Sequence, residues 1–75
     1  MHFVDVVADV LEADPNEITD DANPDTLPNW TSLRHLQLIV ALEEVYGLSF
    51  AYREIRQLTS IGQLRDLLRT RGVTA

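Results

Sequence analysis

The sequence predicts an all-α fold, a small four-helix bundle with three longer helices, one short helix and a long loop between the first two helices. Apolar residues recur at helical spacing in three segments, and no segment shows the sustained alternation that is typical of a strand. The three prolines, Pro15, Pro24 and Pro28, all fall outside these periodic segments. We therefore expect a single domain that spans residues 1–75.

The first helix is predicted from His2 to about Ala13, and Asp14 and Pro15 end it. Its apolar residues recur three and four positions apart, so that they share one side of a helix while the acidic residues turn outward. These apolar residues are Phe3, Val6, Val7, Val10 and Leu11.

The segment from Pro15 to Trp30 is rich in Asp, Asn, Thr and Pro, which is typical of a loop. A loop of this length is uncommon unless its own side chains pack, so we expect Ile18, Leu27 and Trp30 to anchor it to the helices. Asp20 and Asp21 lack the glycine and the closing glutamate of a calcium loop, and no metal site is predicted.

The central helix is predicted between the capping residues that follow Asn29 and the helix-ending Gly47. At about 100° per residue, one face carries Leu36, Ile39, Leu42 and Tyr46, which we expect to be buried. The helix has more apolar width than one packing face needs. We expect its outer edge to meet a partner; this edge comprises Leu33, Gln37, Val40, Ala41 and Glu44.

Two further helices follow, a short one over Ala51 to Gln57 and a final one that begins at Ile61 and ends before Gly72. Thr59 or Ser60 is expected to cap the final helix. The residues expected to meet the buried face of the central helix are Phe3, Val7, Val10, Phe50, Ile61, Leu64 and Leu68.

Composition excludes several classes of partner. A net charge of -6 argues against a nucleic-acid backbone, and no stretch approaches the roughly 20 apolar residues of a membrane span. Without cysteine, packing alone must stabilise the fold. We expect a soluble, cytoplasmic monomer. Met1 directly before the first helix and the end of the chain soon after the last suggest a protein that stands alone, but a domain excised from a larger protein would look the same.

Residues 1–29 hold eight acidic residues and no lysine or arginine, whereas residues 30–75 hold four acids and six arginines. The acidic half either solvates a surface or steers the protein toward basic partner enzymes, and the sequence leaves both interpretations open.

Ser32 stands at the head of the central helix, where its hydroxyl or that of Thr31 is expected to cap the helix. No arrangement of histidine or carboxylate nearby would activate a nucleophile, so an enzyme is not predicted.

The segment from Trp30 to Leu33, followed by His35, Leu36 and the run from Ala41 to Gly47, resembles the phosphopantetheine attachment region of acyl carrier proteins. The likeness continues through Phe50, Glu54, Ile55, Leu58 to Ile61, and Leu64 to Leu68. One departure is Thr31, where this family usually has aspartate, and we expect it to slow a broad-range modifying enzyme.

The resemblance implies a small helical bundle and a carrier function. A phosphopantetheinyl transferase would attach 4′-phosphopantetheine from coenzyme A to Ser32, and the thiol of this arm would hold an acyl group as a thioester. Acyl-loading and acyl-processing enzymes of a fatty-acid, polyketide or related pathway would be the partners. The alternative is a helical interaction module that carries nothing and docks through Leu33 and Val40.

The expected partner-binding residues surround Ser32 on the central helix. Arg34 is expected to repel enzymes built to meet carboxylates, unless it simply points to water. The full set is Thr31, Leu33, Arg34, Gln37, Val40, Ala41 and Glu44.

Overall fold

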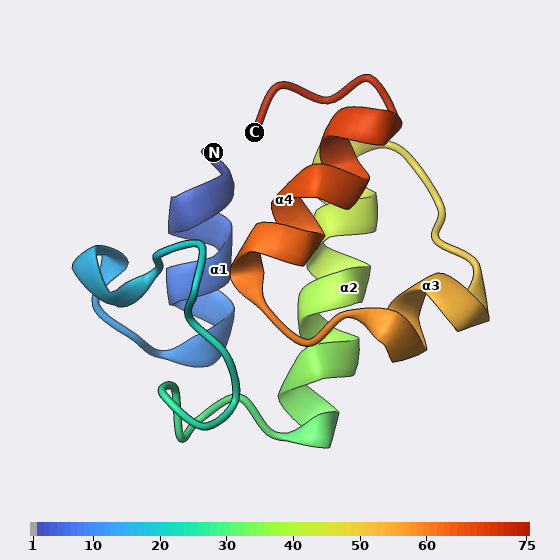
Figure 1. The fold of residues 1–75 in the computed structure, drawn as a ribbon. Coiled ribbons are helices and arrows are strands. Elements are labelled where there is room, and N and C mark those ends of the chain that lie inside the picture. Colours follow the sequence, from blue (N-terminus) through green and yellow to red (C-terminus); the bar gives the residue numbers. More distant parts are fainter. Residues whose placement is uncertain (1) are drawn as a thin grey trace.

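The computed structural model describes residues 2–75. Met1 lies outside the described residues, although it belongs to the predicted domain and to the interpretation of a protein that stands alone. The described chain is all-helical, which confirms the predicted fold class. Figure 1 shows α1 (Phe3–Leu11), α2 (Ser32–Tyr46), α3 (Tyr52–Gln57) and α4 (Ile61–Thr70), with a short 3₁₀ helix (Pro15–Glu17) in the long loop. Within residues 2–75, no helix is both long enough and apolar enough to cross a membrane.

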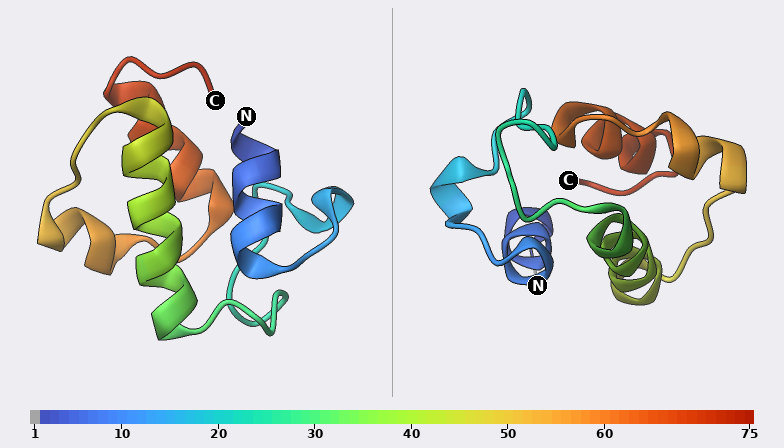
Figure 2. Two further views of the ribbon diagram at one scale, coloured as in Figure 1. Left: turned by 180° about the vertical axis from the view of Figure 1, so that it is seen from behind. Right: turned by 90° about the horizontal axis from the view of Figure 1, so that it is seen from below.

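Helices α1 and α2 run antiparallel and pack against each other, and α4 lies across them (Figures 1 and 2). The core lies between these three helices, because each of them contributes side chains that are fully buried. By contrast, α3 has no buried residue and lies at the edge of the bundle. The largest fully buried side chains are Val7, Leu11, Leu38, Leu42, Ile61, Leu64 and Leu68.

The buried face of α2 differs from the predicted one. Ile39 and Leu42 are buried as expected, but Leu36 is 54% exposed and Leu38, which was assigned to no face, is fully buried. Tyr46 is only partly buried, although this burial raises the pKa of its hydroxyl above the ordinary value. The helix is thus turned by about half of the 100° step between neighbouring residues, so that Leu38 rather than Leu36 packs in the core.

Elsewhere the predicted core is largely confirmed. Phe3, Val7, Phe50, Ile61, Leu64 and Leu68 are buried, and only Val10 is partly exposed. Val10 lies near the C-terminal end of α1, on the side that faces the start of α2, where its carbonyl oxygen accepts a hydrogen bond from Arg34.

The long loop packs by its own side chains, as predicted, since Ile18, Leu27 and Trp30 are buried. The middle of the loop also caps the start of α4 with two backbone carbonyls. The Ala22 carbonyl accepts the N–H of Ile61 at 3.0 Å, and the Asp20 carbonyl accepts the N–H of Gly62 at 2.8 Å. These two bonds satisfy backbone donors that have no partner inside the helix.

We expect Gly62→Ala to destabilise the domain. A Cβ atom at position 62 would lie 2.8 Å from the Asp20 carbonyl oxygen, which is closer than van der Waals contact permits. The overpacking should cost about 1 to 3 kcal/mol of unfolding free energy, more than the gain of up to about 1 kcal/mol from replacing a helical glycine. Urea denaturation measures this difference; a Gly62→Ala protein as stable as wild type would mean that the loop yields without cost.

Candidate functional site

Ser32 is the first residue of α2, and the cap is its neighbour Thr31. The Thr31 hydroxyl accepts the N–H of Arg34 at 3.3 Å, so of the two residues predicted as caps the structure assigns Thr31. Ser32 is exposed, and within residues 2–75 its hydroxyl makes no hydrogen bond. Its oxygen is therefore free to be modified without loss of a helix cap.

The head of α2 favours a negatively charged group on Ser32. The side chain and carbonyl of Thr31 satisfy the N–H groups of Arg34 and His35, which leaves those of Ser32 and Leu33 without a partner among the described residues. The first turn carries no acidic residue. Unpaired N–H groups and the positive end of the helix dipole stabilise a phosphate at this place, so the residues present fit a phosphopantetheine ester.

An exposed apolar strip runs along α2 from Ser32 outward. Leu33 is 66% exposed, Leu36 54% and Val40 52%. A shallow hollow of about 410 Å³ lies beside the strip and is lined by Leu36, Gln37, Val40, Ala41 and Glu44. Four predicted partner-binding residues, Gln37, Val40, Ala41 and Glu44, thus line one hollow. The fifth lining residue is Leu36, which helical spacing predicts in the core.

Arg34 does not share this outer face. Its Nη1 donates to the Val10 carbonyl at 2.9 Å, and its Nη2 lies 3.5 Å from a carboxylate oxygen of Glu12. Both contacts are with the end of α1, while 29% of the Arg34 side chain stays exposed, and its repulsion of approaching enzymes stays a prediction. Spacing alone placed Arg34 near the edge, but its long side chain reaches back across the helix interface.

His35 connects three parts of the molecule one turn after Ser32. The Trp30 indole N–H donates to its Nδ1 at 3.1 Å, and its Nε2 lies 3.0 Å from the Ile55 carbonyl oxygen of α3. The Trp30 and His35 rings are stacked, with centroids 5.9 Å apart. The sequence predicts no role for His35, since a lone histidine beside apolar residues carries no distinguishing spacing.

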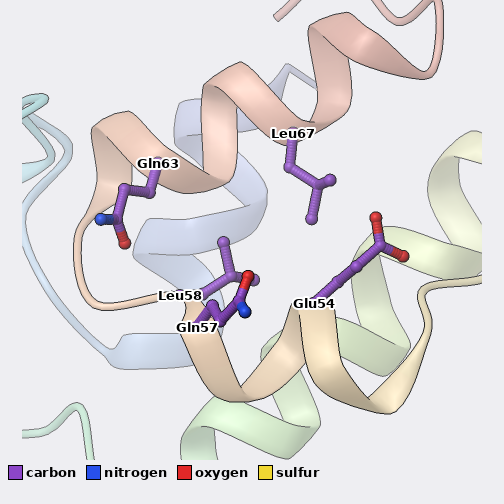
Figure 3. Close-up of a pocket in the computed structure, with 5 residues that line it drawn as sticks. All are labelled: Glu54, Gln57, Leu58, Gln63 and Leu67. Atoms are coloured by element: carbon purple, nitrogen blue, oxygen red, sulfur yellow. The ribbon is translucent and has the colours of Figure 1, made fainter.

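A second hollow, of about 280 Å³, lies between α3 and α4 (Figure 3). Gln63 and Leu67 of α4 face Glu54, Gln57 and Leu58 across it. The Glu54 carboxylate is bound by Arg71 and by the Ala51 N–H, and the Gln63 side chain accepts two hydrogen bonds from Thr59. Much of its polar lining is already used in stabilising the fold. Among the described residues, no group of three His, Cys, Asp or Glu side chains is placed to hold a metal.

No family model matches this chain. The chain is, however, 39% identical over 64 residues to a curated protein of Streptomyces avermitilis named polyketide-8 synthase acyl carrier protein 2. The match covers 85% of this chain and 74% of that protein. The structure agrees with this match, because the described residues form helices α1 to α4 and the central helix α2 starts at the exposed Ser32. This protein therefore belongs to the acyl carrier protein family.

Proposed function

We propose that Ser32 carries a 4′-phosphopantetheine arm and that the protein presents acyl groups, as thioesters of this arm, to the enzymes of a polyketide pathway. A phosphopantetheinyl transferase moves the arm from coenzyme A to Ser32: the Ser32 oxygen loses its proton and forms the new phosphodiester bond, the pyrophosphate linkage of coenzyme A breaks, and adenosine 3′,5′-bisphosphate leaves. The protein itself catalyses no step, and it works as a cytoplasmic monomer.

This proposal rests on the exposure and the surroundings of the Ser32 side chain at the head of α2. The side chain is exposed, caps nothing and lies beside two backbone N–H groups that have no partner within residues 2–75, so a phosphate ester is both reachable and stabilised there. The polyketide pathway is favoured over a fatty-acid pathway by the name of the similar Streptomyces protein.

The partner enzymes would meet the outer face of α2. Leu33, Leu36 and Val40 give this face an apolar strip, and Thr31, Gln37, Ala41 and Glu44 surround it. Exposed apolar side chains in a row are typical of an interaction surface. Arg34 also binds the end of α1, and we expect the exposed part of its charged side chain to repel enzymes built to meet carboxylates.

Intact-protein mass tests the function directly. After coexpression with a phosphopantetheinyl transferase, a carrier gains the mass of one phosphopantetheine group, whereas an interaction module that docks through Leu33 and Val40 gains none. An unchanged mass would favour that module, because the same exposed strip would then serve docking alone.

Thr31→Asp should raise the initial rate of modification by a broad-range transferase. A carboxylate at position 31 adds a charge next to Ser32 that can pair with a basic group of the enzyme, and Asp caps a helix at least as well as Thr. An exposed ion pair of about 0.4 to 1 kcal/mol corresponds to a gain of about two- to fivefold. The matched control is Thr31→Asn, which caps without charge; if Asn and Asp act alike, the charge is not the cause.

A further inference from the structure

Two polar contacts connect α3 to the rest of the bundle, beside the apolar contact of Ile55, which is partly buried against the core. One is the ion pair between Glu54 and Arg71, at 2.5 Å. The other is the contact between the Ile55 carbonyl and His35 Nε2, at 3.0 Å. The second contact is the one near Ser32, because His35 follows Ser32 by three residues on α2. Figure 1 shows α3 beside the N-terminal half of α2.

The contacts of His35 require one protonation state of the imidazole. Nδ1 accepts the indole N–H of Trp30, so it carries no proton, and Nε2 must then donate to the Ile55 carbonyl. Only the neutral ring with its proton on Nε2 makes both bonds. A charged ring would turn an N–H on Nδ1 against the Trp30 N–H and lose that bond.

We propose that His35 is a positioning residue, which in its neutral form couples α3 to the start of α2 and releases α3 when the ring is protonated. Only the functional consequence of this inference rests on the proposed carrier function. That consequence is that α3 forms part of the surface that an enzyme meets beside Ser32. The coupling itself is a property of the unmodified protein.

The groups around His35 do not supply a charge that would replace the lost bond. From the loop, Trp30 is uncharged. On α3, the neighbours of Ile55 are Glu54, which binds Arg71, and Arg56, whose guanidinium lies over the Tyr52 ring. On α2, the preceding Arg34 faces α1.

Protonation changes the geometry of the bridge as a whole. The ring lies stacked on Trp30, and repulsion between two N–H groups moves it away from the indole. A charged Nε2–H is by itself the stronger donor, so the release of α3 requires that the ring movement costs more in alignment with the Ile55 carbonyl than the charge adds. Within α3, Ile55 alone packs against the core and it is only partly buried, so the short helix should open more often.

Two substitutions separate the two nitrogens. In His35→Gln the terminal amide N–H₂ reaches the place of Nε2, so the hydrogen bond to Ile55 remains and no longer depends on pH. In His35→Asn the shorter amide reaches the place of Nδ1, so an acceptor for Trp30 remains while the tie to α3 is lost. Both variants keep a neutral polar side chain at position 35, which makes each a control for the other.

The measurement is amide exchange of the unmodified protein by NMR, corrected for intrinsic rates, at about pH 7.5 and about pH 5, values between which histidines ordinarily titrate. The α3 reporters are the N–H groups of Ile55 and Leu58, and the α4 control is the N–H of Leu64. Wild-type protection in α3 should fall about three- to tenfold at the lower pH. His35→Gln should stay protected at both values, and His35→Asn should be unprotected at both.

Two outcomes would overturn the inference: equal pH responses of wild type and His35→Gln, or a loss of protection in α4 as large as that in α3. Transfer kinetics with a broad-range transferase test the consequence, as the ratio of wild type to His35→Gln at each pH. We expect KM of wild type to rise at the lower pH relative to the variant, with kcat unchanged. If neither protein is ever modified, the proposed function fails while the exchange result still decides the role of His35.

Discussion

The intact mass of Ser32→Ala is expected to remain that of the bare chain after coexpression with a phosphopantetheinyl transferase, while wild type gains one phosphopantetheine group. The loss should be complete because the variant lacks the oxygen that would form the ester. The fold should remain intact, since Ser32 is exposed and the cap of α2 is Thr31. Far-ultraviolet circular dichroism should therefore match that of wild type.

Two neighbouring variants control this result. Thr31→Ala should still be modified, but it should lose about 0.5 to 2 kcal/mol of unfolding free energy with the cap. Ser49→Ala, at an exposed position after α2, should be modified and as stable as wild type. A Ser32→Ala protein that gains the mass would assign the arm to another residue.

Local signals predicted most of the fold. Gly47 ends α2 in the left-handed conformation, with φ of 65°, and Ser60 caps α4 by accepting the N–H of Gln63. Both are properties of a few residues in sequence, which is why they could be predicted. The anchoring of the loop by Ile18, Leu27 and Trp30 followed from their being the large apolar residues of a polar segment.

The orientation of α2 could not be predicted from its own residues. Leucine, isoleucine and valine occur around most of its circumference, so several stripes fit the helical period nearly equally well. The choice among them depends on contacts with residues distant in sequence. Arg34 reaches Val10 and Glu12, and His35 reaches Ile55, so partly buried polar side chains make contacts that the helical period of the apolar residues does not reveal.

Leu42→Ala is expected to cost about 2 to 5 kcal/mol of unfolding free energy. Leu42 is fully buried in α2, and so small a domain has few other contacts to close the cavity. The total stability of natural domains is only about 5 to 15 kcal/mol, so the variant should be partly unfolded at moderate temperature.

The matched control is Leu36→Ala in the same helix, because both changes replace leucine with alanine and alter helix propensity equally. Leu36 is 54% exposed, so its truncation should change stability by no more than about 0.5 kcal/mol. Urea denaturation of the two unmodified proteins measures the difference. If Leu36→Ala costs as much as Leu42→Ala, Leu36 lies in the core as helical spacing suggested, and the exposed strip proposed for partner enzymes is reduced to Leu33 and Val40.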